Sequence, residues 1–291
     1  MGDIAGWEAL ATHVAVDGES VAVIDLPARQ AEQGPPLLVV HGYPTSSIDF
    51  QPVADALAAH RRVVLLDLPG CGLSDKPDRP YSLFGQADVV AAVAADRGLD
   101  RVDLLTHDMG DSVGGELLAR SREGTLGLDV RRRVVTNGSI YLDLAHLTDG
   151  QQALRAMPDA LLPEGFAPDA DRLTDLLLDL CAPDLRSGEV RDRLRAGAEL
   201  VVRGGGNRLL ARLIRYIDER AEHERRWTGA VETHPSPLAV VWGRHDPIAV
   251  AAMVDRLAER RPDAAVTWLD AGHWPMVERP EAFAQAVLAA L

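Results

Sequence analysis

The sequence predicts an α/β protein with a mostly parallel central sheet, flanked by helices and interrupted by a helical insertion. Short β-branched runs alternate with longer Ala- and Leu-rich periodic segments, the pattern of parallel strands covered by helices. The 291 residues are 47% hydrophobic, which is enough for one large core. A long middle stretch has helical pattern broken by prolines and no strand pattern, and this indicates the insertion.

Eight segments have the composition of strands. The first two, 13–16 and 21–26, predict a hairpin with Asp17-Gly18 as its turn. The others are expected at 37–40, 62–66, 103–106, 134–137, 238–242 and 265–269, with helices at 112–120 and 280–291. We therefore expect a core formed by 1–141 and 229–291, and a helical cap, or lid, formed by 142–228. Ligands bind beyond the carboxyl ends of strands in open α/β sheets, so the cap should lie over that edge.

Composition excludes several classes of partner. The formal net charge of −14 argues against nucleic acid and anionic membrane. Cys71 and Cys181 lie in unlike contexts without a CxxC pattern, so we expect buried thiols and no metal or other cofactor. The beginning of the sequence lacks a signal-peptide pattern, and no apolar run approaches the ~20 residues needed to span a bilayer. The Ala-, Arg- and Asp-rich composition is typical of bacterial proteins, and we predict a cytoplasmic one.

The segment from Leu104 to Ser112 predicts a reactive side chain. An apolar strand leads directly into His107-Asp108-Met109-Gly110, and a helix follows, which is the setting of a nucleophile elbow with Asp108 at its centre. Backbone N–H groups at the helix N-terminus would hold the Asp108 carboxylate ionised. The alternative is that Asp108 is an ordinary helix N-cap.

Two later segments favour the reactive interpretation. Asp246 follows the strand expected at 238–242, and His273 follows the strand expected at 265–269. The order nucleophile, acid, histidine is that of hydrolases built on parallel sheets, and each residue lies just beyond a strand's carboxyl end. We therefore predict a triad of Asp108, His273 and Asp246.

A loop after an early strand completes the expected site. In His41-Gly42-Tyr43-Pro44, the backbone N–H of Tyr43 would join that of Met109 in binding an oxyanion. Four side chains near the expected reactive positions are assigned to the substrate pocket: His41, His107, Tyr141 and Trp274. For His41 a structural hydrogen bond within the loop is the preferred alternative.

Together these segments identify a family. The chain resembles the α/β-hydrolase superfamily, and within it the aspartate-nucleophile branch of epoxide hydrolases and haloalkane dehalogenases. The matching segments are His41–Pro44, Asp67–Ser74, His107–Gly110, Gly243–Asp246 and Gly272-His273. Two segments, His107–Val113 and Leu213–Arg220, are similar to the mesoderm-specific-transcript group.

The resemblance also bears on the leaving group. Haloalkane dehalogenases hold the halide with a Trp after the nucleophile and often an Asn in the loop, where this chain has Met109 and Tyr43. Fluoroacetate dehalogenases have an Arg after the nucleophile. Epoxide hydrolases instead activate the ring oxygen with two lid tyrosines, and Tyr216 stands in a similar Arg-Tyr context. A second lid tyrosine is expected soon after the strand at 134–137. Tyr141 is near but fits that position poorly, so the sequence leaves a second lid tyrosine open. Tyr216 has the alternative role of a packing residue on a lid helix.

The resemblance implies a hydrolase that forms a covalent ester between Asp108 and its substrate, with epoxide opening to a vicinal diol as the expected reaction. A haloalkane dehalogenase, an ester or lactone hydrolase, and a non-catalytic ligand-binding protein remain as alternatives. We expect an apolar or weakly polar small molecule as the partner, and a homodimer is allowed for. No cofactor is needed for this chemistry.

Overall fold

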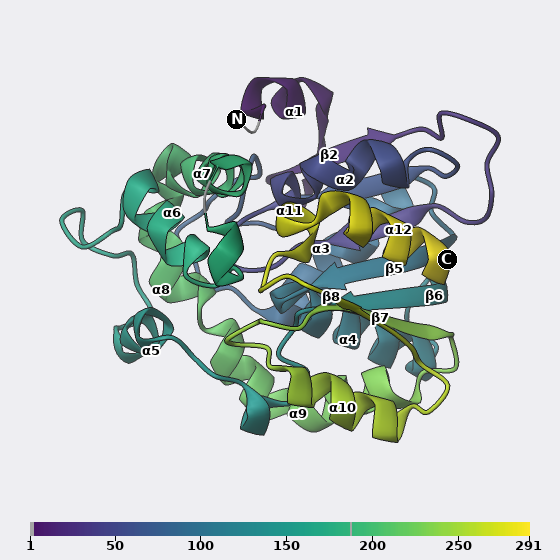
Figure 1. The fold of residues 1–291 in the computed structure, drawn as a ribbon. Coiled ribbons are helices and arrows are strands. Elements are labelled where there is room, and N and C mark those ends of the chain that lie inside the picture. Colours follow the sequence, from purple (N-terminus) through teal and green to yellow (C-terminus); the bar gives the residue numbers. More distant parts are fainter. Residues whose placement is uncertain (1–2, 187) are drawn as a thin grey trace.

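The computed structural model describes residues 3–186 and 188–291 and has one eight-stranded sheet at its centre (Figure 1). The strand order is β1-β2-β4-β3-β5-β6-β7-β8. The hairpin β1–β2 joins β4 in antiparallel fashion, and every pairing from β4 to β8 is parallel. This confirms the predicted fold class.

The strands lie close to the segments expected from sequence. They are β1 (Ala11–Val16), β2 (Glu19–Leu26), β3 (Leu37–Val40), β4 (Val63–Leu66), β5 (Arg101–His107), β6 (Asp129–Thr136), β7 (Leu238–Gly243) and β8 (Ala265–Leu269). Every residue of β3 and of β4 is a buried Leu or Val, as both faces of a central parallel strand require. The β1–β2 turn has Asp17 and Gly18 at positive φ, the geometry of a two-residue hairpin.

Helices cover both faces of the sheet. Helices α2 (Gln51–Leu57) and α12 (Pro280–Ala290) contact each other on one face, and α3 (Leu83–Asp96), α4 (Met109–Glu123) and α9 (Tyr216–Thr233) pack together on the other. Figure 1 shows α10 (Ala251–Arg260) beside α9. Short helices α1 (Ile4–Leu10) and α11 (Pro275–Glu278) lie next to β1 and α12 in the chain.

The expected helical insertion lies between β6 and β7. It contains α5 (Asp149–Ala156), α6 (Ala170–Leu178), α7 (Gly188–Val202) and α8 (Leu210–Leu213), with 3₁₀ turns at Leu142–Leu144, Pro183–Leu185 and Arg203–Leu209. The expected boundary between 228 and 229 falls inside α9, which runs on to Thr233 with a kink at His223. Beyond the kink α9 packs on α4, where the Cβ of Trp227 lies 3.0 Å from the position a Cβ on Gly115 would take. One helix therefore belongs to both the insertion and the sheet's cover.

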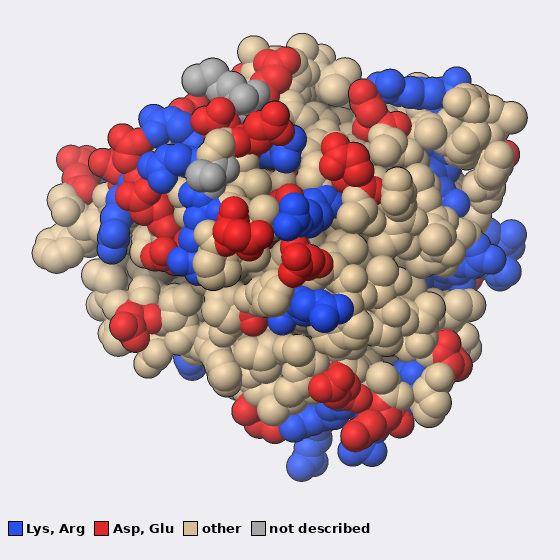
Figure 2. Space-filling view, in the orientation of Figure 1, with Lys and Arg blue, Asp and Glu red and all other residues tan. Residues whose placement is uncertain are grey.

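Polar contacts hold the first part of the insertion to the rest. Helix α5 has no buried residue. Instead, guanidinium groups from the region of α8 donate to backbone carbonyls of 154–162: Arg208 to Leu162, Arg212 to Asp159 and Arg215 to Leu154, Arg155 and Met157. Basic and acidic side chains also alternate over the face formed by α6 and α7 (Figure 2), with ion pairs such as Arg191–Asp175. These arginines of the insertion therefore have protein partners.

Among residues 3–186 and 188–291, no helix combines the length and apolarity needed to cross a membrane.

The turn from β5 into α4 predicts opposite effects of two Gly→Ala substitutions. A Cβ on Gly110 would lie 2.4 Å from the carbonyl oxygen of Val40, whereas one on Gly85 in α3 would meet nothing within 4 Å. We expect Gly110→Ala to lower the free energy of unfolding by ~1–3 kcal/mol through overpacking. Gly85→Ala should raise it by up to ~1 kcal/mol through helix propensity. Urea denaturation of both variants measures this, and equal effects would contradict the close approach at the turn.

Candidate functional site

Asp108 occupies the sharp turn between β5 and α4. Its backbone has φ 50° and ψ −118°, outside the helical and extended regions, so its side chain projects from the turn instead of capping the helix. The turn also brings Gly110 against the carbonyls of Val40 and His41 at the end of β3. The strained residue is thus enclosed by two neighbouring strands and one helix, and this is the geometry expected of a nucleophile elbow.

The two carboxylate oxygens of Asp108 have different surroundings. Oδ2 accepts a 2.8 Å hydrogen bond from the backbone N–H of Tyr43, while Oδ1 lies 3.8 Å from Nε2 of His273. The side chain is only 3% exposed. Burial raises the pKa of Asp108, and it outweighs the lowering effects of His273 and of the Met109 and Tyr43 amides. The Tyr43 N–H therefore binds the carboxylate, and the Met109 amide is near enough to lower its pKa, but the carboxyl's pKa still lies above its ordinary value.

His273 connects Asp108 with Asp246. Its Nδ1 lies 2.7 Å from Oδ2 of Asp246, so Nε2 is the nitrogen that faces Asp108. Burial alone would lower the pKa of His273, but Asp246, Asp108 and Glu278 together raise it to about 8. The structure thus brings the three predicted triad residues into one row of side chains, with a base flanked by two carboxyls.

Asn137 supports the acid of this row, a role that sequence reasoning missed. It follows β6, is fully buried and has φ 48°. Its Nδ2 donates to Oδ2 of Asp246 at 2.8 Å, and its Oδ1 accepts from the N–H of Gly243 at 2.9 Å. Oδ1 of Asp246 accepts the N–H groups of Ile248 and Ala249. Both oxygens of Asp246 are therefore held by donors other than His273.

A second buried acid fixes the histidine's loop. Glu278 in α11 accepts backbone N–H groups from Gly272, Trp274 and Ala182 at 2.8–3.0 Å. The N–H of His273 itself donates to the carbonyl of Leu180, at 2.9 Å. Leu180 and Ala182 belong to the insertion, so the insertion helps to position the base. The sequence offered no signal for these contacts beyond an acid shortly after the histidine.

Two tyrosines lie beside Asp108. The rings of Tyr43 and Tyr216 are 5.7 Å apart between centroids, at 43° to each other, and each residue is 6% exposed. Burial is the first cause that raises the pKa of each phenol, and the charge of Asp108 raises it further in both cases. Both hydroxyls therefore stay protonated and can act as donors.

Two more buried acids lie near the row. Asp111 bonds to the Thr106 hydroxyl and Asp49 to the Thr45 hydroxyl. Burial raises the pKa of Asp111 well above its ordinary range and that of Asp49 to about 7, and the charge of Asp108 adds to both shifts. The raised pKa values favour the neutral form of these acids, which limits the negative charge around Asp108.

Four predicted pocket residues have other roles. His41 accepts the N–H of Leu68 at Nε2 and contacts its neighbour's carbonyl, the structural role preferred above. His107 bonds through Nε2 to the carbonyl of His273, and Trp274 packs on the His273 ring at 4.4 Å between centroids. His107 and Trp274 are both fully buried, and both contact His273. The Tyr141 hydroxyl bonds to Glu232, and its ring lies under the Arg256 guanidinium, so its assignment to the pocket stays a prediction.

No group of three His, Cys, Asp or Glu side chains within the described part of the chain has an arrangement that could hold a metal ion. Cys71 and Cys181 are buried free thiols.

Comparisons with known proteins agree on the family. Residues 37–286 match the model of the "Alpha/beta hydrolase family". LipZ of Mycobacterium tuberculosis, named as a candidate hydrolase, is 42% identical over 265 residues, covering 88% of each chain. The human mesoderm-specific transcript homolog protein is 32% identical over 276 residues, covering 88% of this chain and 78% of its own. A thermophilic esterase from Thermogutta terrifontis has the same fold, with a TM-score of 0.75 at 20% identity over 96% of this chain and 97% of its own.

The Asn137 amide should contribute more stability than an ordinary amide. We expect Asn137→Ala to lower the free energy of unfolding by at least ~1.5–3 kcal/mol, because it removes a hydrogen bond to a buried carboxylate. Asn207, whose Nδ2 donates to the neutral carbonyl of Pro168 at 2.9 Å, provides a matched control that should cost ~1 kcal/mol. Urea denaturation compares the two, and an equal loss would show that the Asp246 contact adds nothing.

Proposed function

Because this chain belongs to the α/β-hydrolase family, we propose that it is a hydrolase whose nucleophile is the Asp108 carboxylate and whose preferred substrate is an epoxide. One observation supports this most directly. Asp108 stands at the elbow with one oxygen bound to a backbone amide and the other free towards His273, while a protonated phenol lies beside it. The product is a vicinal diol.

The first step forms an ester. Oδ1 of Asp108 attacks a ring carbon, that carbon's bond to the ring oxygen breaks, and the oxygen takes the electron pair. Tyr216 gives this oxygen its proton, so the bound product is a hydroxyalkyl ester and the phenol becomes a phenolate. Burial of Asp108 favours this attack, since a carboxylate without a full hydration shell is a better nucleophile.

The second step hydrolyses that ester. His273 takes a proton from water, and the resulting hydroxide attacks Cγ of Asp108. The oxyanion forms on Oδ2, which the Tyr43 amide already holds. When the intermediate collapses, His273 returns its proton to the leaving alkoxide. The proton left on the regenerated carboxyl restores the Tyr216 phenol through water, so one water molecule is consumed per diol.

An oxygen leaving group suits this site better than a halide. Phenol hydroxyls can protonate an alkoxide, whereas a halide needs N–H donors where it departs, and Met109 lies at the position next to the nucleophile. A carboxylate nucleophile also argues against esters and lactones, since its attack on an acyl carbon would give an anhydride. Chloride release from 1-chlorobutane would favour the dehalogenase alternative, and saturable binding without turnover would favour a ligand-binding protein.

A trapped ester tests the nucleophile. We expect His273→Gln to react with styrene oxide and stop at the ester, because water is no longer activated. Mass spectrometry should find one added styrene oxide on the peptide that contains Asp108. The Asp108→Asn variant should gain no mass, and His13→Gln, a change at an exposed histidine in β1, should turn over like the unchanged protein. Modification at another residue, or none with any epoxide offered, would overturn the proposal.

The charge of Asp108 should control the basicity of His273. Burial opposes protonation of His273, but Asp246 and Asp108 outweigh it and raise the pKa to about 8. Ester formation removes the charge of Asp108, so the base becomes neutral more readily just before it must take a proton. Asp108→Asn mimics that change. We expect its His273 pKa, followed by NMR, to fall below that of the unchanged protein, and an equal or higher value would contradict the coupling.

A further inference from the structure

In the proposed function, a single phenol of the insertion, that of Tyr216, donates to the oxygen of the opening ring. Tyr141, the other tyrosine considered for this role, is occupied by Glu232, with a 2.9 Å hydrogen bond. The remaining tyrosine outside the site, Tyr81, donates to the carbonyl of Pro77 at 2.7 Å. Only Tyr43 shares the surroundings of Tyr216. Tyr43 is therefore the one candidate for a second phenol that could donate to the ring oxygen.

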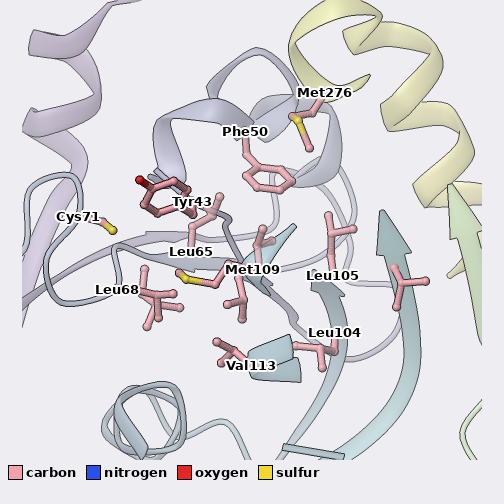
Figure 3. Packing of buried hydrophobic residues seen from close by; sticks show 14 of the residues in the cluster. Tyr43, Phe50, Leu65, Leu68, Cys71, Leu104, Leu105, Met109, Val113 and Met276 are labelled. Atoms are coloured by element: carbon pink, nitrogen blue, oxygen red, sulfur yellow. The ribbon is translucent and has the colours of Figure 1, made fainter. Parts of the chain in front are cut away.

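The position of Tyr43 relative to Asp108 is set by its own backbone. Its N–H binds Oδ2 of Asp108 at 2.8 Å. The Tyr43 side chain therefore begins directly beside the nucleophile. The ring then extends to within 5.7 Å of the Tyr216 ring, measured between centroids. Figure 3 shows the Tyr43 ring above Met109, in the apolar surroundings formed with Leu68. Two phenols from distant parts of the chain thus meet next to one carboxylate.

The hydroxyls of this pair lack good acceptors. The Tyr216 hydroxyl has no hydrogen-bond partner among the side chains and carbonyls of residues 3–186 and 188–291. The Tyr43 hydroxyl has one partner, the Leu210 carbonyl, at 3.4 Å, which is longer than the 2.7–2.8 Å typical of a hydroxyl donor. Two phenol hydroxyls at one place, one without a protein acceptor and one with a long hydrogen bond, are free to donate to a bound molecule.

We propose that the Tyr43 phenol is a second catalytic donor, which binds the substrate's ring oxygen together with Tyr216 while Asp108 attacks the adjacent carbon. This inference rests on the proposed function and extends it. As the carbon–oxygen bond breaks, the oxygen accepts hydrogen bonds from both phenols and takes the proton of one. The other phenol remains protonated and stabilises the new hydroxyl. The donor pair is therefore shared between the core loop and the insertion.

The alternative role for Tyr43 is packing alone, and the two roles differ in which step they affect. Tyr43→Phe keeps the backbone N–H and the ring but removes the hydroxyl. If the hydroxyl is a donor, ester formation slows while ester hydrolysis, which uses the backbone N–H, does not. A packing defect would disturb both steps, because the same loop holds Oδ2 of Asp108 in each.

The experiment measures both rates with styrene oxide. Ester formation is followed by mass spectrometry in the His273→Gln background, and ester decay by rapid quench in proteins with an intact His273. We expect Tyr43→Phe and Tyr216→Phe each to slow ester formation ~10²-fold or more, the size typical of a lost general acid. Tyr81→Phe, which loses a phenol bonded to the Pro77 carbonyl outside the site, should leave it unchanged. Ester decay in Tyr43→Phe should match that of the unchanged protein.

The outcomes separate this inference from the proposed function. If the His273→Gln protein forms no ester, the proposed function fails, and the inference fails with it. If it forms the ester and Tyr43→Phe reacts at the same rate as the Tyr81→Phe control, the inference alone is overturned. A loss of both ester formation and decay in Tyr43→Phe would also overturn it, because that result indicates a structural role.

Discussion

The left-handed turn at Asp108 is the constraint on which the rest of the site depends. It holds because Gly110 lets α4 start against the carbonyls of Val40 and His41, where a Cβ would be 2.4–2.7 Å from oxygen. That close approach places the loop after β3 within reach of Asp108, so the Tyr43 N–H can bind its carboxylate. Both the bond from the Tyr43 N–H to Asp108 and the nearby position of the Tyr43 phenol follow from this one turn.

Charge balance is the second constraint. Asp108 and Asp246 flank one histidine, and burying two carboxylates with one base would be costly if further acids nearby were ionised. Burial raises the pKa values of Asp49 and Asp111, which favours their neutral forms. Asp246 needs neutral donors instead, and receives them from Asn137 and two backbone amides. These features limit the negative charge that surrounds Asp108, whose own pKa burial already raises.

The sequence predicted whatever depends on local pattern. All eight strands were found, although β6 starts at Asp129 and not at the expected 134, because strands are short β-branched runs wherever they lie in the chain. The positions of Asp108, Asp246 and His273 followed from their places just after strands. Asn137 and Glu278 were missed because their roles come from contacts with residues distant in sequence, and the same holds for the meeting of Tyr43 with Tyr216. The end of α9 was misplaced because its second half serves the core while continuing a helix of the insertion.

Helix α9 holds Tyr216, from the insertion, in a fixed position relative to Asp108 in the core. One turn after Tyr216, Arg220 donates to the Ser112 hydroxyl on α4 at 2.9 Å and to the carbonyls of Ser139 and Ile140. Burial lowers the pKa of Arg220 to about 10, so it remains charged at neutral pH. Glu219 accepts the Ser82 hydroxyl at the start of α3. Because α4 begins at Asp108 and Arg220 is bound to α4, a displacement of Tyr216 away from Asp108 would have to break charged, buried hydrogen bonds, each worth ~1.5–3 kcal/mol. The phenol from the insertion is thereby fixed to the same helix that presents the carboxylate.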